Sequence, residues 1–302
     1  DKIGVTKLVL SNGVMVFYKK TDFSDNEILM RAYSPGGSSL IASDADFNNT
    51  KLAMGGLQEA GINGFSKNDL AKMMTGKEVS VSAFVSGNYE GMNGTSVNKD
   101  LEEMFQLIYL NFTALNKNKE AYQSYVDKQS AFLGNLLNTP QYWYMNEKAK
   151  VTQKNNPRFT NAIPTPEEYA SQNYDLAYQF YNQRFADASD FTFMFVGSFE
   201  EAKLIEYANK YLASLPSKGK KETWVDHPYE HLKGQQEFVF NRGEDPKSSV
   251  EITFRTEAPF NKKDAYFIQC AGEALTIKLV ENLREGESGV YGVGARGSAS
   301  QW

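Results

Sequence analysis

The stretch that decides the fold is residues 79–115, VSVSAFVSGNYEGMNGTSVNKDLEEMFQLIYLNFTAL. Residues 79–84 and about 89–97 form two runs of alternating character, which predict a pair of strands. Residues 99–115 then place apolar side chains at helical spacing on one face: Leu101, Met104, Phe105, Ile108 and Leu115. Paired strands followed by a long one-faced helix are typical of the α+β class.

The same mixture of strands and helices extends over the first 215 residues. The other elements expected are a hairpin over 8–18, a strand over 28–33, helices over 45–60, 67–74, 118–137, from Pro140 and over 166–184, a strand over 191–196 and a helix over 200–214. The hairpin turn is predicted at Asn12-Gly13, because this pair between apolar runs favours a tight turn. Gly61 is expected to end one helix, and Ser66 to cap the next.

The pattern of the N-terminus restarts after a break. Residues 216–235 are rich in Lys, Gly and Pro with little periodicity, which is typical of a linker. The elements predicted beyond it are strands at 238–240 and 250–254 and a helix at 262–283. Strand, break, strand and helix also follow one another at 14–60, which indicates a duplicated unit. We therefore expect a first α+β domain over 1–215, a linker over 216–235, and the truncated start of a second homologous domain over 236–302.

Composition excludes several classes of protein. The 41% hydrophobic and 23% charged content is that of a globular chain able to bury a core. A net charge of −5 argues against a nucleic-acid-binding surface. Cys270 has no second cysteine to pair with, so an internal disulfide is excluded. No apolar run approaches the roughly 20 residues of a membrane span. The chain opens Asp-Lys-Ile-Gly without a signal peptide, which processing could have removed; the compartment stays unknown, and the periplasm or cell envelope is compatible with such processing.

Three blocks resemble the pitrilysin/insulinase-type (inverted zincin) zinc metallopeptidases. Residues 10–14, Leu-Ser-Asn-Gly-Val, resemble the opening strand turn of that family. Residues 55–61, Gly-Gly-Leu-Gln-Glu-Ala-Gly, running on through Ser66 to 81–83, are similar to a half of such a peptidase that holds no metal. Leu283-Arg284-Glu285 followed by 289–293, Gly-Val-Tyr-Gly-Val, resembles the late Leu-Arg-Glu…Tyr-Ser-Val signature. The resemblance covers nearly the whole chain, and implies duplicated domains with antiparallel sheets covered by long helices.

The resemblance also implies that this chain holds no metal and no catalytic residue. In an active half, the first long helix carries His-x-x-Glu-His, whose two histidines share one helix face and bind zinc. The corresponding ligand positions here are about Gly55 and Glu59, with Gln58 at the position of the water-activating glutamate. No histidine occurs in residues 1–226. The zinc is therefore expected in a partner half, either upstream in the same chain or on another subunit, and this fragment alone is expected to be inactive.

Two further motifs are rejected. Residues 227–231, His-Pro-Tyr-Glu-His, spell the zinc motif, but they lie in the predicted linker and not on the first helix of a domain. The family's third ligand lies seventy-odd residues further on, and although a nearer carboxylate such as Glu273 could substitute, the spacing selects none. Residues 292–297, Gly-Val-Gly-Ala-Arg-Gly, spell a dinucleotide fingerprint, yet no helix is predicted after them, and they fit a Gly-rich strand better.

Arg284 and Tyr291 are the candidate substrate-binding residues. In the family, an Arg and a Tyr seven residues apart reach from the non-zinc half towards the substrate backbone near the scissile bond. A guanidinium and a phenol can hydrogen-bond a peptide carbonyl and stabilise the oxyanion that develops from it. The alternative is that Arg284 is a surface cation at a helix end and Tyr291 is a core strand residue. Glu287-Ser288 departs from the family's often basic or amide-bearing loop and leaves substrate preference open.

The function that follows is that of the non-catalytic, substrate-clamping C-terminal half of a zinc endopeptidase that cleaves peptides or unfolded polypeptides. The expected partners are the zinc-binding half and the peptide substrate, with no nucleic acid and no membrane span. The alternative is a catalytically dead scaffold or core subunit of the same fold. A free-standing peptidase that uses His227 and His231 is the third and least favoured reading.

Overall fold

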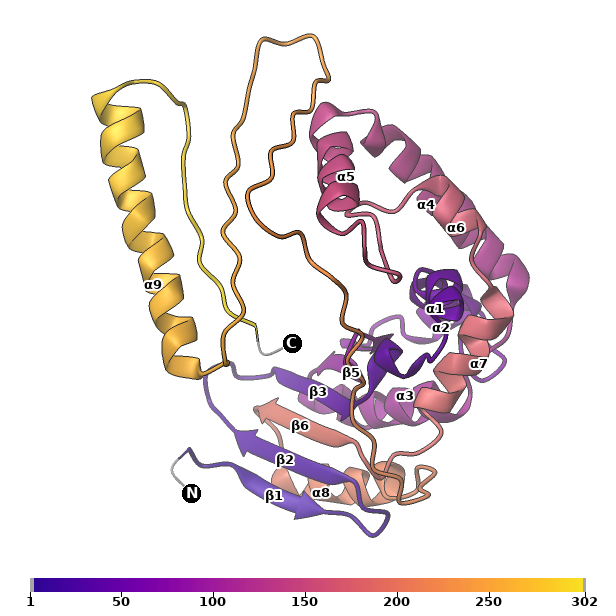
Figure 1. The fold of residues 1–302 in the computed structure, drawn as a ribbon. Coiled ribbons are helices and arrows are strands. Elements are labelled where there is room, and N and C mark those ends of the chain that lie inside the picture. The colour runs from indigo at the N-terminus through magenta and orange to yellow at the C-terminus, as the bar shows by residue number, and fades with distance from the viewer. Residues whose placement is uncertain (1–2, 301–302) are drawn as a thin grey trace. The chain divides into compact units, whose positions relative to one another are not determined.

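The computed structural model describes residues 3–300 of the chain. Its internal contacts divide the chain into two compact units, residues 1–243 (unit 1) and 244–302 (unit 2). Unit 1 contains a six-stranded sheet and most of the helices, and unit 2 contains one long helix (Figure 1).

The strands of unit 1 are β1 Thr6–Val9, β2 Met15–Lys20, β3 Ile28–Pro35, β4 Val79–Val85, β5 Tyr89–Ser96 and β6 Thr192–Gly197. Its α-helices are α1 Asp44–Thr50, α2 Lys67–Met73, α3 Leu101–Thr113, α4 Lys119–Leu137, α5 Pro140–Thr152, α6 Pro166–Ala170, α7 Tyr174–Arg184 and α8 Glu201–Tyr207. Shorter turns are η1 Gly37–Leu40, η2 Ala53–Ala60, η3 Asn98–Asp100 and η4 Ala208–Leu212. Unit 2 has α9 Lys262–Leu279, continued by the wide turn η5 Val280–Gly286.

The sheet runs in the order β1-β2-β6-β3-β5-β4. The predicted hairpin forms between β1 and β2, with Gly13 in the turn at φ 89°. β6 comes from more than 150 residues downstream and enters between β2 and β3. It is parallel to β2 and antiparallel to β3, and the other neighbouring pairs are antiparallel. The predicted α+β class is confirmed, with one parallel pair in the sheet.

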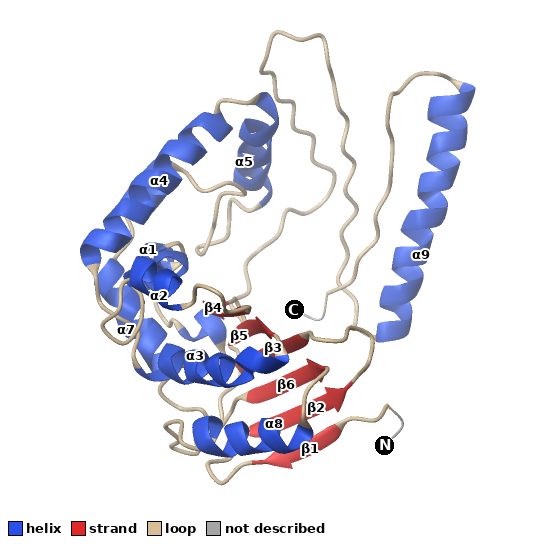
Figure 2. Cartoon of the chain, turned by 180° about the vertical axis from the view of Figure 1, so that it is seen from behind, coloured by secondary structure: helices blue, strands red, loops and turns tan. Residues whose placement is uncertain are grey.

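One face of the sheet is covered by α3 and α8 (Figure 2). The burial of β3 alternates accordingly: Ile28 and Met30 are buried, whereas Leu29 between them is exposed. On the covered face, the ring of Phe105 from α3 stacks on Phe195 from β6, with centroids 5.1 Å apart. Truncating such a buried ring to Ala costs about 3–5 kcal/mol, so this contact anchors the long helix on the sheet.

The single helix predicted over 166–184 is wrong, because the chain forms α6 and α7 with a break between them. Thr165 and Glu168 make a capping box at the start of α6. Asn173 then begins a new helix, since its side-chain oxygen accepts the N–H of Leu176 at 3.0 Å. A second N-cap supplies partners for N–H groups that a new helix end leaves free, so the local hydrogen bonds favour two short helices.

Part of the expected linker is attached to unit 1. Residues 216–227, which we call the strap, contain no helix or strand. The N–H groups of Lys218 and Lys220 both donate to the carboxylate of Asp187, each at 3.0 Å. Further along, the N–H of Val225 donates to the Ser39 hydroxyl at 2.9 Å. The strap is therefore held along its length, unlike a free linker.

The strands predicted at 238–240 and 250–254 are absent from the part of the chain that the structure describes. A strand needs a neighbour to complete its ladder of hydrogen bonds. Phe240 instead packs edge-on against the ring of Tyr144, with centroids 5.5 Å apart. Val250 and Phe254 are 88% and 93% exposed, so these apolar side chains are not packed against other described residues.

Unit 2 consists of α9 and the extended chain that lies beside it. Asn261 caps α9 by accepting the N–H of Asp264 at 2.8 Å. The Thr276 hydroxyl exchanges two hydrogen bonds with the backbone of Ala295, at 3.0 and 2.8 Å. Residues 292–297 therefore run along α9, and the Gly-rich strand predicted there does not form in this structure.

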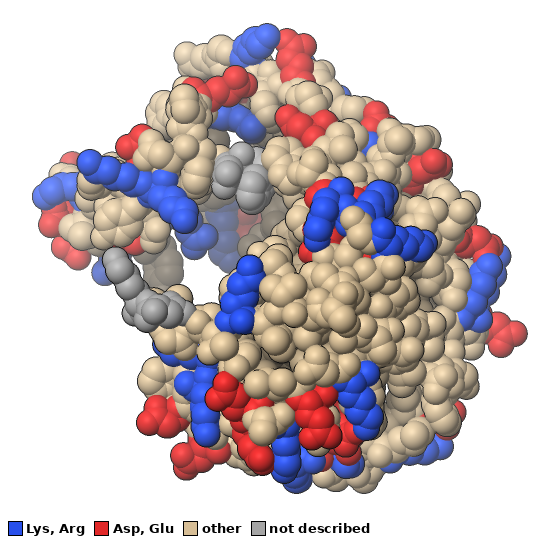
Figure 3. Space-filling model, turned by 90° about the horizontal axis from the view of Figure 1, so that it is seen from below, with Lys and Arg blue, Asp and Glu red and all other residues tan. Residues whose placement is uncertain are grey.

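The surface gives two further findings. Acidic and basic side chains are interspersed around a largely uncharged area on the face shown in Figure 3. Among the described residues, no helix has the length and apolar character that crossing a membrane requires.

Candidate functional site

Arg284 and Tyr291 both lie in unit 2, just beyond α9. Arg284 is in the wide turn η5. The helix then ends in a reversal where the N–H of Gly289 bonds the carbonyl of Leu283 at 3.0 Å, and Tyr291 follows two residues later. Both side chains are exposed, Tyr291 fully so at 102%. Within residues 3–300 neither side chain has a hydrogen bond, ion pair or ring contact, so both are available to another molecule.

Two of the residues that the family resemblance places at the zinc-ligand and water-activating positions, Glu59 and Gln58, have other partners in this structure. The side chain of Glu59 pairs with Lys67 at 2.5 Å. The amide of Gln58 donates to the carbonyl of Ala83 on the edge strand β4, also at 2.5 Å. Gly55, at the first ligand position, has no side chain. Among the described residues, no group of three or more His, Cys, Asp or Glu side chains is arranged to hold a metal ion.

The residues that spell His-x-x-Glu-His lie on non-helical chain at the end of the strap and just beyond it. The ring nitrogen Nε2 of His227 is 2.7 Å from the carbonyl oxygen of Ser39. The ring of His231 packs against Tyr229, with centroids 4.1 Å apart. In the His-x-x-Glu-His motif a helix brings both histidines onto one face, and this segment is not helical.

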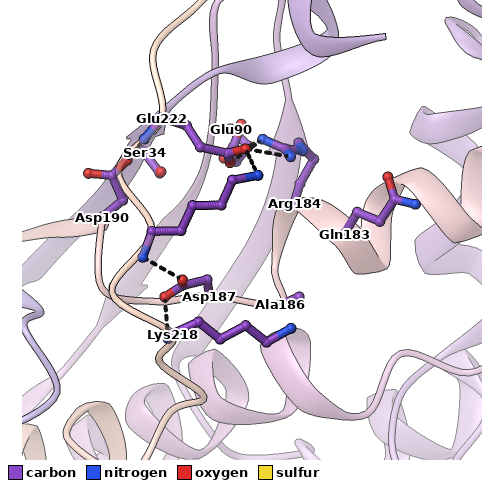
Figure 4. Close-up of a pocket in the computed structure, with 10 residues that line it drawn as sticks. Ser34, Glu90, Gln183, Arg184, Ala186, Asp187, Asp190, Lys218 and Glu222 are labelled. Atoms are coloured by element: carbon purple, nitrogen blue, oxygen red, sulfur yellow. Dashed lines mark hydrogen bonds and ion pairs between the residues drawn. The ribbon is translucent and has the colours of Figure 1, made fainter. Parts of the chain in front are cut away.

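A buried cluster of charges, which the sequence did not reveal, lies where α7 ends beneath the strap (Figure 4). The guanidinium of Arg184 makes two hydrogen bonds to Glu222 of the strap, at 2.7 and 3.3 Å. Its Nη1 also lies 3.8 Å from Oε1 of Glu90 on β5. Arg184 thus stands between two carboxylates at the wall of a cavity of about 240 Å³.

Burial changes the acidity of these groups. Glu90 is only 1% exposed, and this burial raises its pKa to about 7, although the N–H of Gly37 and the charge of Arg184 act to lower it. Burial also acts to raise the pKa of Glu222, but hydrogen bonds from Arg184 and Lys220 outweigh it and hold that pKa below its usual range. In Asp187, likewise, hydrogen bonds from Ser189 and the strap outweigh burial and hold the pKa at about 2.

Residues distant in sequence build this cluster, which is why spacing could not find it. Arg184 and Glu222 are 38 residues apart, and Gly37 and Glu90 are 53 apart. One signal was present: Glu90 interrupts a strand that otherwise shows small and apolar side chains on its buried face. A lone carboxylate at such a position indicates a buried partner.

Comparison with known proteins supports the family resemblance. Residues 171–301 match the family model described as the peptidase M16 inactive domain. The chain is 24% identical over 303 residues to a probable zinc protease PqqL of Haemophilus influenzae, covering 97% of this chain and 31% of that protein. It is 23% identical over 301 residues to a zinc protease PQQL-like of Arabidopsis thaliana, covering 96% and 29%.

The fold matches a solved structure as well. The crystal structure of the periplasmic protease PqqL from Escherichia coli superposes with a TM-score of 0.73 at 21% identity, covering 99% of this chain and 33% of that one. The chain thus spans about a third of the length of these relatives. The resemblance to pitrilysin/insulinase-type zinc metallopeptidases is confirmed, and residues 171–301 match the inactive domain of such proteins.

Proposed function

We propose that this non-catalytic M16-type chain holds the peptide substrate of a zinc endopeptidase, with Arg284 and Tyr291 contacting the substrate backbone. The observation that carries the proposal is the exposure of both side chains, which have no partner within residues 3–300. A tyrosine that served only as a core residue would be buried.

The chemistry of the two side chains suits a peptide carbonyl. The Arg284 guanidinium is a permanent cation with several N–H donors, and the Tyr291 hydroxyl adds a neutral donor. Donors that are fixed before reaction stabilise the negative charge that develops on a carbonyl oxygen at no further cost of reorganisation. Zinc in the partner half would supply the activated water, and this chain would position the peptide.

The partner half and the compartment belong to the same proposal. We expect a zinc-binding N-terminal half, upstream in the same chain or on another subunit, because the chain spans about a third of its relatives. The solved relative is described as periplasmic, so we propose the periplasm or cell envelope here too. Residues 236–302 would then open a second domain whose further strands cover Val250, Ile252 and Phe254.

A direct test compares the chain alone with the chain plus the zinc half. Alone, it should retain no stoichiometric zinc after dialysis and should not hydrolyse a fluorogenic peptide. With the zinc half restored, peptide hydrolysis should appear. One zinc per isolated chain, lost in a His227→Ala/His231→Ala double variant, would contradict the proposal.

The alternative function is a catalytically dead scaffold subunit of the same fold. An upstream or neighbouring sequence with His-x-x-Glu-His favours the peptidase, and its absence favours the scaffold. If the protein is a scaffold, the chain combined with its partner half would show no peptidase activity.

A further inference from the structure

The strap binds to unit 1 as an extended chain whose backbone pairs with side chains. Its N–H groups at alternate residues point to one row of acceptors: Lys218 and Lys220 donate to Asp187, and Glu222 donates to Asp190 at 2.8 Å. Alternate N–H groups also point one way in a β-strand. Here carboxylates replace the neighbouring strand, so the attachment depends on charge.

One guanidinium carries the central contact of this attachment. Arg184 is 8% exposed, its Nε has no hydrogen-bond partner among the described residues, and its face lies over the ring of Phe180 at 5.4 Å. It therefore has Glu222 as its close ionic partner, with Glu90 further away at 3.8 Å. Glu222 is also paired with Lys220, so a neutral Glu90 leaves Glu222 with two cations beside it. A charged Glu90 adds a second, buried anion, whose nearest cation is Arg184 at 3.8 Å.

We propose that the strap is a latch that is docked while Glu90 is neutral and is released when Glu90 becomes charged. A buried, incompletely paired carboxylate is costly, and detachment of the strap relieves the cost by admitting water to Glu90. The other charged groups that face this cluster are Asp187, Asp190, Lys218 and Lys220, which line the same cavity. This proposal is independent of the roles proposed for Arg284 and Tyr291.

Release of the latch frees residues 216–227 and leaves the chain beyond them attached to unit 1. The side-chain amide of Asn155 donates to the carbonyl of Glu230 at 3.1 Å, and Phe240 packs edge-on against Tyr144. Release therefore opens the cavity that Glu90, Arg184 and Glu222 line, without detaching the rest of the segment.

The pH window follows from the raised pKa of Glu90. Its docked pKa of about 7 exceeds the ordinary value of 4.5 that it regains when solvated, so its neutral form stabilises the docked strap at low pH. This stabilisation of the docked strap is complete below pH 4.5 and is lost as the pH rises from 4.5 to about 7. Above pH 7 it does not change further. The equilibrium constant for release of the strap should increase by up to about ten-fold per pH unit inside this window. The depressed pKa values of Asp187 and Glu222 place their titrations below the window.

Hydrogen exchange of the strap amides tests the latch. The amides of Lys218, Lys220, Glu222 and Val225 are followed in the 302-residue chain from pH 5 to 8, with correction for intrinsic rates. All variants carry His227→Gln, because the ring of His227 contacts the Ser39 carbonyl at the end of the strap and its removal leaves Glu90 as the group under test. Protection should fall at least about ten-fold between pH 5 and 7 and then level off. Amides of β3 and β5 should stay protected throughout and report that the fold is intact.

Two variants distinguish release of the strap by Glu90 from a pH-dependent destabilisation of the whole of unit 1. Glu90→Gln, which cannot ionise, should keep the strap protected at every pH. Glu222→Ala, which removes the partner of Arg184, should leave the strap poorly protected even at pH 5. Two results would overturn the proposal: amide protection in the strap that does not change with pH in the chain that retains Glu90, or an equal loss of protection in Glu90→Gln. The parent profile decides the question even if Glu90→Gln fails to fold.

Discussion

Tyr125 of α4 lies directly over Gly56 of η2, so closely that a β-carbon at Gly56 would be 2.5 Å from its Cδ1 atom. Gly56 lies between Gly55 and Glu59, at about which the family resemblance places the zinc ligands of a catalytic half. In this chain the aromatic ring of Tyr125 packs on the backbone there.

Gly56→Ala should therefore destabilise the protein. The added methyl group must displace the ring of Tyr125 and also meets Tyr122 at 3.0 Å. Overpacking of this kind costs about 1–3 kcal/mol, measured as a loss of free energy of unfolding in urea. Gly87→Ala is the matched control, since nothing lies within 4 Å of its β-carbon position, and it should change stability by less than about 0.5 kcal/mol. Equal effects of the two substitutions would count against close packing at Gly56.

Arg184→Met should be strongly destabilising at pH 6. The substitution removes the buried one of the two cations paired with Glu222, and the positive charge beside Glu90. Breaking a buried ion pair by removing one member costs about 3–5 kcal/mol. Arg31→Met on the exposed face of β3 is the control and should be close to neutral. A loss below about 1 kcal/mol for Arg184→Met would show that the cluster contributes little to stability.

Limited trypsin digestion at pH 6 should cut first at Lys247 or Arg255. Both lie in an exposed stretch without helix or strand. Lys218, Lys220 and Lys221 in the strap should be spared, because the backbone around them is hydrogen-bonded to Asp187 and Asp190. Fragment masses over a short time course identify the first cut. Earliest cleavage within the strap would mean that it behaves as the free linker that its composition suggests.

The sequence predicts what depends on local periodicity. The hairpin at 8–18, the strand pair β4 and β5 and the face of α3 follow from alternation and helical spacing, which neighbours in sequence set. The break between α6 and α7 was not predicted. It depends on the N-cap at Asn173, a local signal that the continuous apolar pattern of residues 166–184 obscures. The strap and its charge cluster could not be predicted, because Arg184 and Glu90 are brought together only by the tertiary fold.

Arg284 and Tyr291 were selected by family resemblance alone, since no local pattern distinguishes an exposed tyrosine that binds substrate from one that does not. The structure adds that both side chains are exposed and that Tyr291 follows the reversal after η5. Their role in substrate holding is therefore open to a kinetic test.

The most direct test of substrate holding is the kcat of Tyr291→Phe in the complete enzyme with its zinc half present. The substitution removes one hydroxyl donor and keeps the ring, so kcat should fall by about 10²–10³-fold if this hydroxyl stabilises the oxyanion. Zinc content and melting temperature should not change, because the exposed hydroxyl has no partner within residues 3–300. Tyr266→Phe, an exposed tyrosine on α9, is the matched control and should keep full kcat. Full kcat in a folded, zinc-loaded Tyr291→Phe enzyme would contradict the account.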